Sequence, residues 1–411
     1  MKTLNQNVLD GILSLYGEAQ YDLQVARYTE ILDKFNEKYT GEPIFVSSPG
    51  RIEICGNHTD HQHGRVLGAA IDLDTAGAIV SNDDGTVIVD SIGYSPVKFN
   101  ANDLTLREEE KGTSVALTKG VLKHLQDKGY KIGGFTALTK SRVFKGAGVS
   151  SSASFEVLIA KIISVLFNDD SITPLEQIYA AHFAENVYFG KPCGLLDQSM
   201  IAMGGVNYID FLDTSAPVFE HMTPDLTNYG IVLVNTGGDH SDLTPCYAGV
   251  KDEMREVANF FGKSVLREVD YLEYVDKLPD LAKSVSGRAI LRAQHFFSEN
   301  ERVLTARNAL KDNDLAKFFD MLNKSGDSSY KLLQNCYVPT DTAERIPLAL
   351  LMANMVDGVV ASRVHGGGFA GTVLIVVERL KVDALRDKAV KVFGEDNVYC
   401  LSIRNKGAVK F

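Results

Sequence analysis

The sequence has no long apolar run and no excess of positive charge. A membrane span needs roughly 18 apolar residues, and the longest candidate, 157–167, is interrupted by Lys161. The N-terminus lacks the hydrophobic segment typical of a signal peptide. Asp and Glu (53) outnumber Lys and Arg (42), so the net charge is −11, whereas proteins that wrap nucleic acid need a basic surplus. We therefore expect neither a membrane nor a nucleic-acid partner.

The five cysteines form no paired motif. They are Cys55, Cys193, Cys246, Cys336 and Cys400, with no CxxC spacing. An odd, scattered set fits neither a disulfide framework nor a zinc site. We expect reduced, mostly buried thiols and a cytoplasmic location.

The first half of the 411 residues mixes helices and strands without strict alternation. Residues 1–40 have apolar positions at helical spacing. The turn Asp83-Asp84-Gly85 between the β-rich runs 76–81 and 86–90 predicts a β-hairpin. Further on, the pattern predicts a strand at 133–143, a helix with one broad apolar face after residue 150, and a second helix at about 174–188. This mixture indicates an α+β protein.

Near 204–217 the composition turns to Gly, Asp and Pro, and we place a domain boundary between residues 212 and 213. The length also favours two or three domains. The expected domains are 1–212 and 213–411. In the second, the pattern predicts strands at 231–235 and 373–377, and helices across 250–262, 296–311 and 313–324.

A glycine- and serine-rich segment at 146–152 precedes the helix expected after residue 150. Gly146 and Gly148 allow a close backbone approach, and Ser150, Ser151 and Ser152 place hydroxyls at the helix start. A helix N-terminus presents free N–H groups and the positive end of a dipole, which suits a phosphate. There is no Walker A Gly-Lys-Ser/Thr. Alternatively, the serines cap a core helix.

Two other segments are distinctive. Residues 366–371 match the letters of the dinucleotide fingerprint, but they precede a strand rather than a helix, which excludes that interpretation. Residues 51–63 hold three of the nine histidines. Their spacing is not that of a zinc protease or zinc finger, so we favour a polar loop that hydrogen-bonds a polyhydroxylated ligand over a metal site.

Together these segments resemble the three signature motifs of the GHMP small-molecule kinases, and the first is similar to the galactokinase signature. That signature reads roughly Gly-Arg-x-Asn-x-Ile-Gly-Glu-His-x-Asp-Tyr, and matching residues here are Gly50, Arg51, Gly56, His58 and Asp60. Further matches are Pro192-Cys193-Gly194-x-x-Asp197-Gln198, Ser-Glu-Asn-Glu-Arg at 298–302, and Arg363-x-x-Gly-x-Gly-Phe369. Five motifs in order make the resemblance specific.

The resemblance implies an ATP-dependent, Mg²⁺-requiring kinase that phosphorylates the anomeric hydroxyl of galactose. Its catalytic aspartate would be Asp197, with Arg51 as its basic partner. The sugar contacts implied are Asn57, His58, Asp60, Gly194 and Tyr247. The phosphate loop would comprise Gly146, Gly148 and Ser150–Ser152, and Ser152 and Glu185 would coordinate Mg²⁺. The fold implied is two-domain α+β: an N-terminal domain like the second domain of ribosomal protein S5 and a ferredoxin-like C-terminal domain. We expect a monomer.

Several residues depart from the family's pattern. Glu53 and Asn57 stand where galactokinases usually have Asn and Glu, His61 replaces Tyr, and His365 and Ala370 alter the third motif. A Glu at position 57 would repel a carboxylate at sugar carbon 6, whereas Asn removes that charge and adds N–H donors. A galacturonate 1-kinase is therefore the alternative.

A sugar and ATP sensor without turnover is a minor alternative. Sensors related to this family tend to lose the serine-alanine step of the second motif. Here Ser152-Ala153 is present, together with Arg51 and Asp197, which favours an enzyme.

Overall fold

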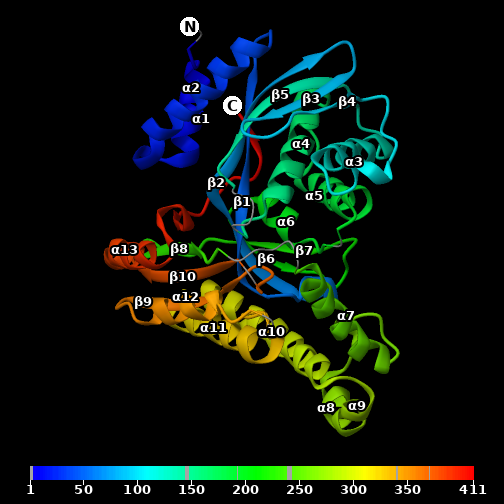
Figure 1. The fold of residues 1–411 in the computed structure, drawn as a ribbon, viewed down its shortest axis with the longest axis vertical. Coiled ribbons are helices and arrows are strands. Elements are labelled where there is room, and N and C mark those ends of the chain that lie inside the picture. The colour runs from blue at the N-terminus through cyan, green and yellow to red at the C-terminus, as the bar shows by residue number, and fades with distance from the viewer. Residues whose placement is uncertain (1–2, 144–147, 192, 238–242, 339–340, 370) are drawn as a thin grey trace.

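The chain folds around two β-sheets, one in each half of the molecule (Figure 1). The computed structural model describes residues 3–143, 148–191, 193–237, 243–338, 341–369 and 371–411. The mixture of helices and strands confirms the α+β expectation. Among the described residues, no helix combines the length and apolarity needed to cross a membrane.

The larger sheet has eight strands, in the order β12-β1-β2-β5-β3-β4, with β6 paired to β2 and β7 paired to β6. Among the described strands of this sheet, β3 and β5 run parallel and the other pairs are antiparallel. The strands are β1 (Ile44–Cys55), β2 (Arg65–Asn82), β3 (Thr86–Ser91), β4 (Val97–Asn100), β5 (Gly134–Ser141), β6 (Val206–Asp210), β7 (Val218–Met222) and β12 (Val409–Lys410).

The hairpin predicted at 76–90 is wrong. Strand β5 lies between β2 and β3, so the two runs joined by the Asp-Gly turn do not pair with each other. Gly134, the first residue of β5, packs against that turn, and a Cβ at Gly134 would lie only 2.6 Å from the carbonyl carbon of Gly85. A glycine at this position lets the inserted strand approach.

Helices cover both faces of the larger sheet. Because side chains alternate along β5, Leu138 faces α1 and α2, whereas Phe135 and Ala137 face α3, α4 and α5. The helices are α1 (Gln6–Tyr16), α2 (Tyr21–Lys38), α3 (Ser114–Asp127), α4 (Ser151–Phe167), α5 (Pro174–Phe183) and α6 (Leu196–Met203). The helices predicted at 1–40 and after residue 150 are thereby confirmed.

The smaller sheet is antiparallel, in the order β11-β8-β10-β9, and is also covered by helices on both faces. Its strands are β8 (Tyr229–Asn235), β9 (Val359–His365), β10 (Thr372–Glu378) and β11 (Val398–Leu401). One face packs on α10 and α11, and the other on α12 and α13. The helices of this half are α7 (Thr244–Phe260), α8 (Tyr271–Asp276), α9 (Leu278–Ser284), α10 (Gly287–Lys311), α11 (Leu315–Ser328), α12 (Arg345–Asn354) and α13 (Val382–Phe393).

The boundary at residues 212/213 stays a prediction. The hydrogen bonding of the larger sheet continues past it through β7, and the chain returns to that sheet at β12 after completing the smaller one. Figure 1 shows the C-terminus beside the N-terminal helices, far from α8 and α9.

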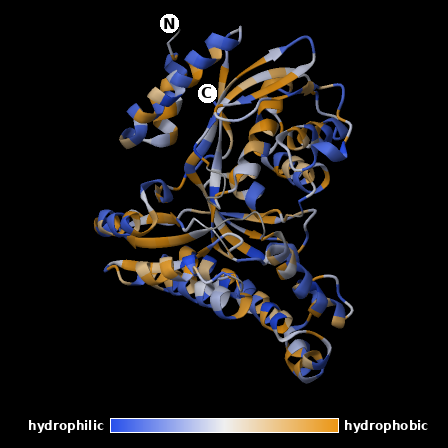
Figure 2. Cartoon of the chain, viewed as in Figure 1, coloured by the Kyte–Doolittle hydropathy of each residue, from blue (hydrophilic) through white to orange (hydrophobic). Residues whose placement is uncertain are grey.

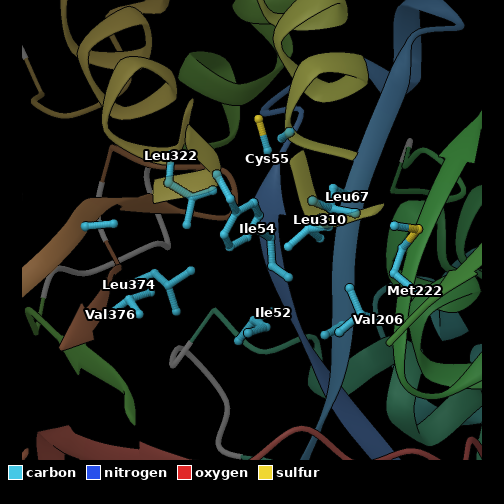
Figure 3. Close-up of a cluster of buried hydrophobic side chains, with 14 of the residues drawn as sticks. Ile52, Ile54, Cys55, Leu67, Val206, Met222, Leu310, Leu322, Leu374 and Val376 are labelled. Carbon is cyan, nitrogen blue, oxygen red and sulfur yellow. The ribbon is translucent and has the colours of Figure 1, made fainter. Parts of the chain in front are cut away.

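An apolar core joins the two halves beneath strand β1. Ile52 and Ile54 of β1 meet Leu374 and Val376 of β10 and Leu322 of α11 (Figure 3). Apolar residues gather along the strands and the inner helix faces (Figure 2). Because side chains alternate along a strand, Arg51 and Glu53 project from the opposite side of β1. This core therefore supports the strand that carries the first motif.

The cysteines are all free thiols. Only Cys55 and Cys336 are buried, while Cys193 and Cys246 are half-buried and Cys400 is exposed. The expectation of mostly buried thiols is therefore wrong, because strand β11 presents Cys400 on an exposed side.

Candidate active site

The first and second motifs meet where β1 passes the N-termini of α4 and α6. Gly50 lets β1 come close to the loop before α4, since a Cβ there would lie 3.0 Å from the carbonyl oxygen of Val149. The next residue, Arg51, donates its backbone N–H to that same oxygen at 3.3 Å. Asp197 lies in the first turn of α6. The structure thus brings the two residues predicted to be catalytic into contact.

Arg51 and Asp197 form a side-chain ion pair. Arg51 Nε donates to Asp197 Oδ1 at 2.7 Å, and Arg51 Nη1 donates to the Gly148 carbonyl. Ser150 Oγ donates to the other carboxylate oxygen of Asp197. The Arg51 side chain is 7% exposed, while that of Asp197 is 35% exposed. The carboxylate is therefore oriented by two donors and still reachable by a ligand.

The pKa of Asp197 lies below its usual range. Burial alone would raise it, but the charge of Arg51 and the hydrogen bonds from Ser150 and Arg51 lower it further than burial raises it. Its place in the first turn of α6 also favours the charged form. Asp197 is therefore an anion at neutral pH.

The described part of the predicted phosphate loop leads directly into α4. Gly146 lies outside the described residues. Gly148 has φ +65°, and Ser150, at the N-cap of α4, has φ +60°. Ser150 gives no side-chain hydrogen bond to the first turn because its hydroxyl is bound to Asp197. The N-terminus of α4, which carries Ser151 and Ser152, is thus left without a side-chain cap, as an anion site requires.

The two residues predicted to hold Mg²⁺ are adjacent. Ser152 Oγ lies 3.1 Å from Glu185 Oε1, and Gln198 Nε2 donates to Glu185 Oε2 at 3.1 Å. Glu185 sits in a π-helix, Ala184–Phe189, that extends α5; such irregular turns are frequent at functional sites.

Glu156, one helical turn after Ser152, is fully buried, and neither carboxylate oxygen has a hydrogen-bond partner among the described residues. Burial and the neighbouring charge of Glu185 raise its pKa well above the usual range. Glu156 is therefore a neutral acid, and the oxygen donors of the type that Mg²⁺ prefers are the Ser152 hydroxyl and the Glu185 carboxylate.

The predicted sugar contacts lie within the loop 56–64, which links β1 to β2, or pack against it. His58 Nε2 donates to the Gly367 carbonyl at 3.0 Å, and the Tyr247 hydroxyl donates to the Gly368 carbonyl at 3.0 Å. Gly194 lies directly against Asp60, because a Cβ at Gly194 would fall 1.8 Å from Asp60 Oδ2. His58, Asp60, Gly194 and Tyr247 therefore gather near one another. Their role as sugar ligands stays a prediction.

Asn57 is engaged differently from these four residues. Its side chain is fully buried, with Nδ2 donating to Glu53 Oε1 at 2.9 Å and to the Gly366 carbonyl at 2.6 Å. Its Oδ1 accepts from Ser329 at 3.2 Å and from Asn335 at 2.8 Å. An asparagine amide has two donors and two acceptor sites, and all four are used here. A sugar contact by this side chain, as predicted, would require the network to open.

Three residues to which the sequence assigned no role hold Glu53 in place, either directly or through a neighbour: Arg363, His365 and Thr372. Arg363 donates to Glu53 Oε1 at 2.9 Å. His365 Nε2 accepts the Glu53 N–H at 3.0 Å, which leaves Nδ1 to donate to Thr372 Oγ1 at 2.9 Å. Thus the third motif binds the first through side chains. The reciprocal departures at positions 53 and 57 were the signal that could have revealed their contact. Ala370 lies outside the described residues.

Comparisons with known proteins match the two segments that carry Arg51 and Asp197. The galactokinase galactose-binding signature matches residues 33–80, and the GHMP kinase N-terminal domain matches residues 116–205. A galactokinase of Clostridium tetani is 32% identical over 346 residues, which cover 83% of this chain and 86% of the relative. A galactokinase of Pyrococcus furiosus is 32% identical over 85% of this chain and 93% of its own length.

The solved structures agree. Lactococcus lactis galactokinase complexed with galactose superposes with a TM-score of 0.81 at 27% identity, covering 93% of this chain and all of that one. Methanococcus jannaschii mevalonate kinase has a TM-score of 0.65 at 18% identity, over 89% and 99% of the two chains, and supports the fold alone. The two-domain GHMP kinase architecture follows. With its motifs in contact and most of its length aligned, the chain belongs to the galactokinase family of GHMP kinases.

Proposed function

We propose that the protein transfers the γ-phosphoryl group of ATP to the C1 hydroxyl of galactose, giving galactose 1-phosphate and ADP. The observation that carries the proposal is the Arg51–Asp197 ion pair between β1 and the first turn of α6, next to the N-cap of α4 and beside the loop that holds His58 and Asp60. Family membership supports the same reaction.

The chain's own residues supply positioning and electrostatics. Asp197 accepts or steers the proton of the anomeric hydroxyl, and Arg51 keeps it ionised and offsets charge on the transferred group. Free N–H groups in the first turn of α4, with the hydroxyls of Ser151 and Ser152, hold the phosphates. Phosphoryl transfer requires little more than this alignment and charge stabilisation.

We propose that Ser152 and Glu185 hold Mg²⁺ together with oxygens of the nucleotide. Held there, Mg²⁺ would supply positive charge that offsets the negative charge of the nucleotide phosphates. Among the described residues, no group of three or more His, Cys, Asp or Glu forms a metal cluster. Few protein ligands suit Mg²⁺, which usually keeps several waters and binds substrate phosphates.

The protonation of Asp60 predicts a pH dependence. Burial, together with the nearby charge of Asp197, raises the pKa of Asp60 to about 6. An ionised carboxylate accepts stronger and more numerous hydrogen bonds from sugar hydroxyls than a protonated carboxyl does, so the proton taken up at lower pH weakens binding. We expect kcat/KM for galactose to fall by about tenfold per pH unit below pH 6, since this ratio reports the free enzyme. Initial rates between pH 5 and 8 with ATP saturating measure it.

The control for this prediction is kcat/KM for ATP with galactose saturating, which should fall less because the bound sugar holds Asp60 ionised. A galactose profile that stays flat from pH 7 to 5 would contradict the assignment of Asp60.

A galacturonate 1-kinase is the second candidate, favoured by cations near the sugar loop. Lys251 and Arg255 follow Tyr247 at helical spacing on α7, and their charges lower the pKa of His61, after the larger effects of burial and His58. Neither has an ion-pair partner within the described part of the chain. A cationic rim would favour a sugar carboxylate.

A sugar panel separates the two candidates. In a coupled ADP-release assay with Mg-ATP, we expect turnover of galactose with a kcat/KM about tenfold or more above that of galacturonate. N-acetylgalactosamine and glucose complete the panel. Preference for galacturonate would overturn the proposed substrate. Galactose binding by calorimetry without turnover of any sugar would favour the sensor.

The positions 53 and 57 provide a sharper variant for the same assay. Asn57→Glu places a second carboxylate beside Glu53 in a buried site, where like charges cost several kcal/mol, so we expect loss of activity or of folded protein. Glu53→Asn/Asn57→Glu restores one carboxylate and one amide, and we expect it to keep galactose activity within about threefold. If Asn57→Glu and the double variant have the same galactose activity, the side chains at positions 53 and 57 are not coupled.

We also propose a cytoplasmic location and a monomer, with small molecules as the partners. The five free thiols support a reducing compartment.

A further inference from the structure

The Ser-Glu-Asn-Glu-Arg segment at 298–302 has no role in the mechanism above, yet it lies on α10 against the loop 56–64. This loop carries the predicted sugar ligands His58 and Asp60. It is held by side chains of α10 at both of its ends, and the two ends use different residues of the helix.

The start of the loop is bound by two residues one helical turn apart. Glu299 Oε1 accepts the backbone N–H of Gly56 at 2.9 Å. His295 Nε2 donates to the carbonyl of Asn57 at 2.9 Å, while its Nδ1 accepts from Ser328 at 2.8 Å. Both His295 and Glu299 are fully buried. These bonds fix the backbone on either side of the Gly56–Asn57 peptide, immediately before His58.

The charge on Glu299 is itself stabilised. Burial would raise its pKa, but Arg302 and the other nearby cations lower it to about 2. Arg302 pairs directly with the Glu299 carboxylate. Glu299 therefore remains an ionised, strong acceptor for the Gly56 amide across the working pH range.

The end of the loop is bound by the residues of α10 that follow directly after Glu299 and His295. Asn300 Oδ1 accepts the backbone N–H of Arg65 at 2.9 Å, and Arg267 donates to the same oxygen at 3.0 Å. Glu301 forms an ion pair with the Arg65 side chain at 2.8 Å. Phe296 also packs here, with its ring 3.0 Å from where a Cβ of Gly64 would lie.

The loop needs such support because its backbone is strained. His58 has φ +58° and His63 has φ +59°, in the left-handed region that side-chain-bearing residues seldom adopt. Such conformations persist only where the surroundings hold them. Within the loop, Thr59 Oγ1 lies within hydrogen-bond distance of the carbonyls of both Gly56 and Arg65, at 2.9 and 2.6 Å, which closes the loop but does not attach it to the second half of the molecule.

We propose that Glu299 and Asn300, assisted by His295, are positioning residues that hold the sugar-binding loop in its binding conformation from α10. The proposal rests on the proposed function, since it assigns sugar binding to this loop. It predicts that loss of either attachment weakens the sugar without weakening ATP, because α10 donates no hydrogen bond to the described part of the phosphate loop.

Asn300 offers the matched variants for the test. Asn300→Leu keeps the size of the side chain but removes the acceptor of the Arg65 amide. Asn300→Asp keeps that acceptor beside Arg65 and Arg267. Ser298→Ala changes the same segment at a residue whose hydroxyl accepts from Gln294, with no bond to the loop. Because the chain has no Trp, galactose binding is best followed by calorimetry.

We expect Asn300→Leu to raise the Kd for galactose by about 10- to 100-fold, because the strained loop that carries His58 and Asp60 loses one of its attachments, with KM for ATP within about twofold. Asn300→Asp and Ser298→Ala should bind galactose as the unchanged protein does. A lower melting temperature with an unchanged galactose Kd in Asn300→Leu would overturn the proposal in favour of a purely structural role. Failure of the unchanged protein to bind galactose would instead overturn the proposed function.

Glu299→Gln gives an independent second measurement at the other end of the loop. Its amide oxygen can still accept the Gly56 N–H, but the charge is gone, so we expect a smaller rise in galactose Kd than in Glu299→Ala. Equal galactose Kd values for both variants and the unchanged protein would contradict positioning from this end.

Discussion

Asp197→Asn is expected to lower kcat by about 10³-fold while galactose still binds. General base assistance and electrostatic stabilisation of a developing charge each contribute about 10²–10⁴ in rate. Asparagine keeps the size of the side chain but cannot take a proton, and it no longer balances the charge of Arg51, which lies 2.7 Å away. A coupled ADP-release assay measures kcat, and calorimetry measures galactose Kd in the same preparation.

The matched control is Ser150→Ala, which removes one donor to Asp197 but leaves the ion pair. It should raise the pKa of Asp197 and lower kcat by less than the Asp197 variant does, about tenfold for one hydrogen bond to a charged group. If Asp197→Asn kept kcat within about threefold of the unchanged protein, the residue would be a ligand rather than a catalytic group.

Much of the fold followed from local patterns in the sequence. Helix α4 and strand β10 are strongly periodic or apolar, and their predicted positions agree with the structure. Pairing was less predictable, because it depends on contacts between distant segments. Nothing local to the Asp83–Gly85 turn shows that β5, some 50 residues later, enters between β2 and β3. Nor does the composition of the last residues reveal that β12 returns to pair with β1.

The active site shows the same contrast between features that local sequence predicts and features that depend on contacts between distant segments. Arg51 and Asp197 lie in motifs with strict spacing, so a resemblance could assign them, and the structure places them in contact. The surroundings of Asn57 could not be assigned that way, because its partners Ser329, Asn335 and Gly366 come from the second half of the chain. A register shift in β1 after Glu53 accompanies the turn towards Asn57. The departures at 53 and 57 are thus one exchange of carboxylate and amide between two touching positions.

The largest loss of stability is expected from Asp74→Ala, a residue that is not part of the active-site ion pair. Asp74 is fully buried in β2 and accepts from Arg27 Nη1 at 2.6 Å and from Arg404 Nη1 at 3.3 Å. Tyr16 and Ser47 also donate to its carboxylate. The carboxylate therefore connects α1, α2, the larger sheet and the C-terminal segment. Removing it leaves two buried guanidinium groups without their anion, which destabilises a protein by about 3–5 kcal/mol.

Urea unfolding of Asp74→Ala and Tyr16→Phe tests this expectation. Tyr16→Phe removes one hydroxyl donor and keeps the charges, so it should lower the free energy of unfolding by only about 1 kcal/mol. Equal losses for the two variants would show that the buried charges do not determine the stability of this region.

The acid dependence of stability gives a second measurement on Asp74. Burial raises its pKa, but Arg27 and Arg404, with the donors Ser47 and Tyr16, lower it below the ordinary value. A carboxylate whose folded-state pKa is depressed contributes stability above its unfolded pKa, and that contribution is lost as the pH falls through the folded-state value. We therefore expect the difference in unfolding free energy between the unchanged protein and Asp74→Asn to shrink as the pH falls below about 4. A constant difference from pH 7 to 3 would mean that the network holds these helices by packing rather than by charge.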